Sequence, residues 1–180
     1  MDKPIITWVD PTTGATKTTL TYTAVSGGAV VADEESAVIS VGIANNFTVG
    51  SAKAEALMNA TDCELRITDT TGAPAGYAVT EGWVNALCTS DPAYVDGTTT
   101  FTKLGKVGEA GAEVKLSVTA GDATAAKTIK GAINDGTVAA AKAAFNIATV
   151  NMKALVASST GATGGTQQFR TVLVYSYGAV

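Results

Sequence analysis

The sequence is dominated by short segments in which apolar and polar residues alternate with a period of two. In AEVKLSVTA (112–120), Val114, Leu116 and Val118 fall on one side, and QFRTVLVYSYGAV (168–180) alternates in the same way. This period is the spacing at which side chains share one face of a strand. Turn-forming Gly, Asp and Thr residues separate about seven to nine such segments. We therefore expect a mainly β, antiparallel β-sandwich, jelly-roll or Ig-like, with one or two short helices.

The expected strands are distributed along most of the chain. They cover 5–9, 18–25, 36–47, 63–72, 79–88, 98–105, 112–120, 146–156 and 168–180. In one of them, Cys63, Leu65 and Ile67 are predicted to face the core together. The segment AKAEALMNA (52–60) has apolar residues at helical spacing and predicts one or two turns of helix. Gly82 lies where a bulge or a close backbone approach is expected.

Residues 137–156 fit two descriptions. TVAAAKAAF (137–145) has high helix propensity, and its apolar stripe continues at helical spacing into the following residues. However, NIATVNMKALV (146–156) also alternates strictly. We favour a short helix or irregular arm followed by a strand. The Gly/Ser/Thr-rich segment 158–166 is expected to be a flexible hairpin loop, and 89–99 a protruding loop.

Length and composition favour one β-rich domain spanning residues 1–180. An extended N-terminal arm and an Ala-rich insertion near 121–145 are compatible with this division. Only 16% of residues are charged and 6% are aromatic, while 46% are hydrophobic. About 25% charged is usual. Such a chain is expected to form a smooth, weakly charged surface suited to packing against copies of itself.

Charge and residue usage exclude several classes of function. The net charge of −4 and the absence of any basic run argue against nucleic acid as the main partner. The chain has no histidine, which removes the commonest general base and transition-metal ligand. Cys63 and Cys88 do not form a CxxC pair, and we expect two buried free thiols and no cofactor. No signal peptide and no membrane-spanning run are expected, so synthesis in a cytoplasm follows.

Two groups of carboxylates are the candidates for chemistry. Asp33-Glu34-Glu35 has no EF-hand spacing, and a solvated acidic turn is favoured over a Ca²⁺ site. Glu81 and Asp91 could be paired as in a glycosidase, but a pair at this spacing is common by chance. No phosphate-binding loop or nucleophile motif is present. The sequons at Asn46 and Asn59 are interpreted as chance matches in a Thr-rich chain. We expect no catalytic, cofactor or metal residues.

Aromatic residues and the 89–99 loop are the candidates for contact with other molecules. Trp83 follows Gly82 in an expected strand, and Tyr175 and Tyr177 share one face of the last strand. Buried or interfacial anchoring is the natural role of such side chains. The candidate interface residues are Trp83, Asp91, Tyr94, Phe101, Tyr175 and Tyr177.

Several segments together resemble small β-rich structural proteins of bacteriophage particles, namely tail or baseplate components and capsid decoration proteins. They are CELRITDTTGAPAG (63–76), VTEGWVNALC (79–88) followed by FTKLG (101–105), and FRTVLVYSYG (169–178). The resemblance implies a non-enzymatic virion subunit that assembles in the host cytoplasm through sheet edges and loops. Its implied partners are copies of itself, as a homo-oligomer, and other virion structural proteins. The Ala-rich region 121–145 departs from the pattern.

A binding module is the alternative interpretation. An Ig-like or carbohydrate-binding domain displayed on a surface would use aromatic residues such as Trp8 and Tyr94 to stack on sugars. It predicts a monomer with exposed tryptophan, whereas a virion subunit predicts assembly.

Overall fold

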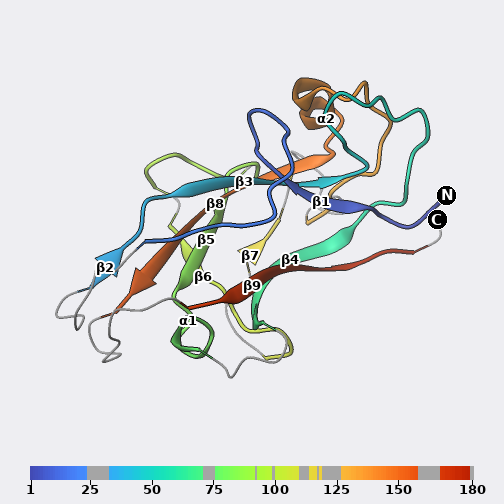
Figure 1. Cartoon of the computed structure of the whole chain (residues 1–180). Helices are drawn as coiled ribbons and strands as arrows, with labels where there is room; N and C mark the ends of the chain where they lie inside the picture. Colours follow the sequence, from blue (N-terminus) through green and yellow to red (C-terminus); the bar gives the residue numbers. More distant parts are fainter. Residues whose placement is uncertain are drawn as a thin grey trace.

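Strand β8 (Ile147–Val156) is the centre of the larger of two antiparallel sheets. Its strand order is β1-β3-β8-β5-β6, and β2 also pairs with β8 (Figure 1). The other members are β1 (Ile6–Val9), β2 (Glu34–Glu35), β3 (Ile39–Asn45), β5 (Val84–Cys88) and β6 (Thr102–Lys103). Alternate residues of β8 are fully buried, as the alternating pattern of 146–156 predicts.

The smaller sheet has the order β7-β4-β9. Its strands are β7 (Val114–Lys115), β4 (Thr61–Asp69) and β9 (Phe169–Ser176). β4 and β9 pair antiparallel over most of their lengths, from Glu64 opposite Val174 to Asp69 opposite Phe169. β9 is therefore the edge of this sheet, with β4 on one side of it.

The computed structural model describes residues 1–23, 33–70, 76–91, 93–98, 100–109, 114–116, 118, 127–157 and 167–178. Within this part, the main core lies between the two sheets and contains Cys63, Leu65 and Ile67 of β4 opposite Val150 and Met152 of β8. The prediction of a mainly β protein with two antiparallel sheets and two short helices is confirmed, and the arrangement is sandwich-like. The expected hairpin loop 158–166 lies outside the described residues.

A second, smaller core covers the opposite face of the larger sheet. Val9, Ala44, Phe47 and Ile147 pack there against Ala141. Ala141 belongs to helix α2 (Val138–Ala143), whose first turn is capped by Thr137 because its hydroxyl accepts the Ala140 N–H at 3.1 Å. The expectation of a short helix followed by a strand in 137–156 is confirmed.

Two expected strands begin or end differently from the prediction. Residues 77–80 form a single helical turn, α1 (Tyr77–Thr80), where a strand from residue 79 was expected. Gly82 then reverses the chain at a positive φ of 60°, which suits glycine, and β5 begins at Val84. The expected strand 98–105 is reduced to β6, and Phe101 lies just before it.

The helix expected in 52–60 is absent, and the prediction is wrong. Backbone N–H groups there donate to distant segments: Leu57 to the carbonyl of Gly131 and Met58 to that of Asp2. Helical i to i−4 bonds are replaced by these contacts, so tertiary pairing overrides the local propensity. A strand was also expected in 18–25, but the described residues 18–23 of that segment belong to no strand.

Buried asparagines hold the irregular segments near residues 55–60 and 127–135 against the end of the larger sheet. Asn46 donates from its side-chain amide to the carbonyls of Glu55, Gly131 and Ala132 at 2.8–3.1 Å. Its φ is 54°, a conformation that Asn tolerates better than most residues. Asn45 and Asn146 donate to neighbouring carbonyls in the same way.

We expect Asn46→Ala to lower the free energy of unfolding by about 2–4 kcal/mol, because buried carbonyls lose their donor and alanine disfavours the positive φ. Chemical denaturation measures the effect. Asn151→Ala is the control: its side chain accepts one hydrogen bond from Ser40 at the surface, and a loss below about 1 kcal/mol is expected. Equal losses in the two variants would contradict a clamping role for Asn46.

Candidate binding cleft beside strand β9

The acidic cluster at residues 33–35 does not form the turn that was expected. Glu34 and Glu35 form β2 and pair with Val156 and Leu155 of β8. The Glu35 carboxylate accepts a hydrogen bond from Lys153 at 2.8 Å. Among the described residues, no group of three or more Asp, Glu, Cys or His side chains is placed to hold a metal ion.

Glu81 and Asp91 have structural surroundings. Glu81 is exposed in the turn after α1, and Asp91 accepts the backbone N–H of Ala93 at 2.8 Å. The asparagines of the two sequons also have structural roles. Asn46 is buried, and the Asn59 side chain accepts the backbone N–H of Gly131. These contacts give Asp91 and the two asparagines structural roles.

Both cysteines are free and buried, as expected. Burial raises the pKa of the Cys63 thiol to about 12, because the thiolate is poorly solvated in the core. The unfolded thiol ionises at lower pH, so its ionisation lowers stability as pH rises from 9 toward 12. A thiol in this state is a poor nucleophile at neutral pH.

The structure separates the six candidate interface residues. Trp83 is half-buried between α1 and β5, and Phe101 lies under the Lys153 ammonium at 4.8 Å. The Tyr94 hydroxyl donates to Asp96 at 2.9 Å in the exposed 89–99 loop, next to Asp91. Tyr175 and Tyr177 form a tilted ring pair at the end of β9, with centroids 6.2 Å apart. The set does not form a single described cluster, and its role in contacts stays a prediction.

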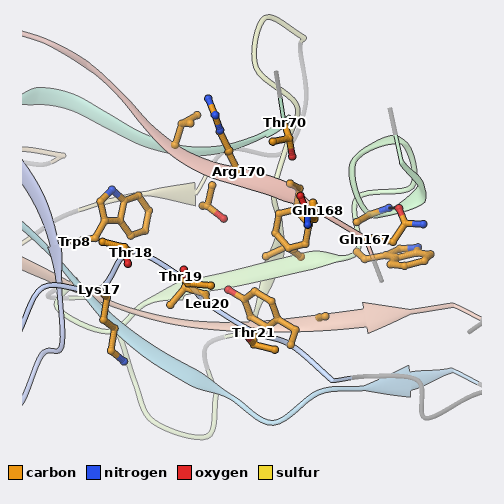
Figure 2. A pocket seen from close by; sticks show the side chains of 18 of the residues that line it. Trp8, Lys17, Thr18, Thr19, Leu20, Thr21, Thr70, Gln167, Gln168 and Arg170 are labelled. Atoms are coloured by element: carbon orange, nitrogen blue, oxygen red, sulfur yellow. Dashed lines mark hydrogen bonds between the residues drawn. The ribbon is translucent and has the colours of Figure 1, made fainter. Parts of the chain in front are cut away.

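A cleft of about 1150 Å³ lies between residues 16–23 and the start of β9. Figure 2 shows Trp8 at one end of it and Gln167 at the other, with Thr18–Thr21 along one wall and Gln168–Arg170 along the other. Trp83 is the one member of the predicted interface set among the described residues that line the cleft. Both tryptophans of the chain therefore border it.

Residues 18–23 form one wall of the cleft, and the packing of their side chains keeps them in place. Lys17 donates its backbone N–H to the Trp8 carbonyl at 2.8 Å, but no described backbone hydrogen bond follows in 18–23. Leu20 and Tyr22 pack on the main core, as their predicted alternation indicates. The Tyr22 ring stacks on Phe169 at 6.1 Å, and its hydroxyl lies 3.8 Å from the Met152 sulfur. Burial raises the pKa of Tyr22 well above its usual value.

The other wall is the outer edge of β9, and its backbone directions follow from β4. Ile67 donates its N–H to Gly105 and accepts from Val107, both at 3.0 Å, on the side of β4 opposite β9. Thr171 lies opposite Ile67 and therefore forms a non-hydrogen-bonded pair with it. The N–H and C=O of Thr171 point away from β4. Because backbone direction alternates along a strand, Phe169 and Leu173 point the same way.

The cleft is lined mainly by uncharged residues, and Lys17 and Arg170 are the charged residues in its described lining. Threonine hydroxyls and the amides of Gln167 and Gln168 supply polar groups, and the described lining residues include no carboxylate and no cysteine. The Lys17 ammonium makes an ion pair with Asp10 at 3.3 Å and donates to the Ser40 carbonyl. The arrangement can bind an elongated neutral molecule, and its lining lacks paired acid and base groups for catalysis.

Sequence reasoning missed most of this cleft. The alternation of Leu20 and Tyr22 marked their inward face correctly, but nothing in the pattern indicated that the backbone beside them is unpaired. Gln167, Gln168 and Thr171 carry no signal of their own in the sequence, because they lie in or next to an ordinary alternating strand.

If side chains alone hold residues 18–23, Tyr22→Ala should release this segment. We expect trypsin to cleave after Lys17 at least about tenfold faster in that variant, since truncating a partly buried aromatic residue that packs on the core should cost more than the roughly 1.4 kcal/mol that corresponds to tenfold. Cleavage after Lys153 in β8 requires global unfolding and should stay much slower than cleavage after Lys17 in the same variant. Tyr94→Ala, at a half-buried tyrosine that is not among the described lining residues, is the matched control, and equal acceleration in both variants would contradict the anchoring role of Tyr22.

Neither helix in the described part of the chain is long and apolar enough to span a membrane. No known family model matches the chain. No significant match was found among curated proteins or among solved structures.

Proposed function

We propose that the protein is a non-enzymatic structural subunit of a bacteriophage or phage-like particle, which assembles through β-sheet edges and loops. Its partners would be copies of itself and other structural proteins of the particle. It would be incorporated into the virion after synthesis in the host cytoplasm. The proposal rests on one structural observation: no described strand pairs with the outer edge of β9, which is called its open edge below.

β9 is eight residues long, and its outer edge lacks the usual protection against pairing with other chains. The strand contains no proline and one charged residue, Arg170. Natural edge strands are commonly shielded by lysine, proline or short length, since an unshielded edge pairs with other strands. Val174 is 43% exposed on the outward face, and Tyr177 just beyond the strand is 52% exposed. An edge of this kind suits a protein whose normal state is an assembly.

The weakly charged, Thr-, Ala- and Gly-rich composition supports the same proposal, because it allows close packing of repeated subunits. The 89–99 loop, in which residues 93 and 95–98 are exposed and Asp91 and Tyr94 are half-buried, is a second surface for neighbour contacts. The resemblance of 63–76, 79–88 and 169–178 to phage structural proteins adds the class of particle.

A carbohydrate-binding module is the second candidate, and the position of the two tryptophans favours it. Trp8 and Trp83 border one cleft that also carries threonine hydroxyls and glutamine amides. Aromatic faces with nearby hydrogen-bonding groups are the usual elements of a sugar site. Tyr94, which was expected to act with Trp8, is not among the described lining residues.

We expect Val174→Lys to weaken self-association or incorporation into the particle, because a lysine beside an open edge repels an incoming strand. Sedimentation equilibrium or light scattering should show a shift toward the monomer. Stability should change by no more than about 0.5 kcal/mol, since the site is exposed. Ile133→Lys, at another exposed apolar residue, is the control and should leave assembly unchanged.

Immunogold electron microscopy of the source particle, beside mass measurement of the purified chain, completes this test. Labelling of the particle together with a symmetric oligomer or a co-assembly supports the proposal. A strictly monomeric protein absent from every particle would refute it.

A further inference from the structure

We infer that the cleft beside β9 is a slot for one extended, uncharged peptide segment of a different protein, which inserts as an additional strand between β9 and residues 18–23. The inference rests on the proposed function and names the kind of neighbour that the subunit would bind.

The two sheets differ in size, and this difference creates the slot. Six strands form the larger sheet, whereas three form the smaller one. Among the described residues the smaller sheet ends at β9, and the cleft beyond β9 is also lined by Val84, Ala154 and Val156 of the larger sheet. There, Leu20 and Tyr22 cover the core from a segment that belongs to neither sheet. Residues 18–23 thus lie on the core without being hydrogen-bonded to the strand beside them.

Backbone groups on both walls define the chemistry of the occupant. Phe169, Thr171 and Leu173 direct their N–H and C=O groups away from β4, toward the open edge. On the other wall, residues 18–23 make no backbone hydrogen bond with any described residue. Neighbouring strands lie about 4.8 Å apart, and an inserted strand can pair with a wall on each side of it. A polypeptide main chain alternates donors and acceptors at the spacing that such walls require.

The side chains select a neutral segment. Lys17 is engaged with Asp10 and Ser40, and in Figure 2 the Arg170 guanidinium points away from Thr18–Thr21. The remaining lining is mainly Thr, Val, Ala, Gln and aromatic residues. Alternating small apolar and hydroxyl side chains fit this surface, whereas a charged side chain directed into the slot would lie unpaired.

A different protein is favoured over a second copy of this chain. Every strand in the described part is already paired within its own two sheets. A described strand of a second copy could offer the slot at most one free edge, whereas a segment of another chain that is paired on neither edge can bond to both walls.

Tryptophan fluorescence provides a direct readout, because both tryptophans of the chain border the cleft. The probe is a short peptide of alternating threonine and valine with glutamine at each end and blocked termini. Titration into the whole protein should give a saturable change in fluorescence. In NMR spectra, the amides of Phe169, Thr171 and Leu173 should be the most perturbed.

Thr171→Pro removes the N–H that faces the slot and leaves the β4–β9 bonds of Arg170 and Val172 in place. We expect it to weaken peptide binding at least tenfold. Thr171→Val is the matched control: it also lacks the hydroxyl but keeps the N–H, and binding should be retained. If Thr171→Pro does not fold, the wild-type protein and a peptide N-methylated at alternate residues test the same hydrogen bonds, and binding should again fall at least tenfold.

Equal binding to Thr171→Pro and Thr171→Val, or to methylated and unmethylated peptide, would overturn the inference. A fluorescence change with maltohexaose or another neutral oligosaccharide, and none with the peptide, would overturn it in favour of a glycan site. If the peptide does not bind but the chain is found in particles, the slot fails and the proposed function stands. If the peptide binds but the chain is found in no particle, the proposed function fails and the peptide site remains.

Discussion

Each residue of a β-strand carries a backbone donor and acceptor, and a strand within a sheet pairs them on two edges. In this protein β9 is paired on one edge by β4. Its other edge faces a cleft whose far wall, residues 18–23, is docked by side chains alone. Because no described strand pairs with this outer edge, the smaller sheet ends at β9. Tyr22 then covers the part of the core beside it. A backbone with unmet hydrogen bonds at a surface is the strongest available reason to expect a partner.

The centre of the larger sheet is fully paired by contrast. β8 is paired on both sides, and its inward residues are fully buried in the main core. At one end of the larger sheet, Asn45, Asn46 and Asn146 replace strand pairing with side-chain amides that bind the carbonyls of irregular segments. The hydrogen bonds that these amides donate stabilise a loop-rich region that has few apolar side chains to bury. The outer edge of β9, which no described strand pairs, therefore contrasts with β8 at the centre of the larger sheet.

Much of the fold could be predicted from the period of two, because burial on one face imposes that period directly on the sequence. The inward face of β4 was predicted residue by residue, the strict alternation of 146–156 reappears as alternating burial in β8, and Val114 and Leu116 are buried as expected. The alternation of Leu20 and Tyr22 was also correct about the side chains. It could not reveal whether the backbone finds a partner strand, since pairing depends on segments far away in the chain.

Local propensity failed where tertiary hydrogen bonds compete with it. Residues 52–60 have helical spacing, yet Leu57 and Met58 donate to Gly131 and Asp2 instead of to their own helix. For the candidate site, the sequence indicated Trp83, which does border the cleft. In this account Thr171 matters because its backbone N–H and C=O point toward the cleft. The identity of a residue does not indicate this direction. Thus aromatic residues could be predicted from the sequence, whereas the strand edge required the register of β4 and β9.

Amide hydrogen exchange along β9 in the isolated subunit tests the open edge most directly. The account predicts alternation: the amides of Arg170, Val172 and Val174 exchange slowly because they bond to β4, whereas those of Thr171 and Leu173 exchange rapidly. On assembly or partner binding, the fast amides should become protected. Uniform protection of all five amides in the isolated subunit would show that the outer edge is already paired and would contradict the account.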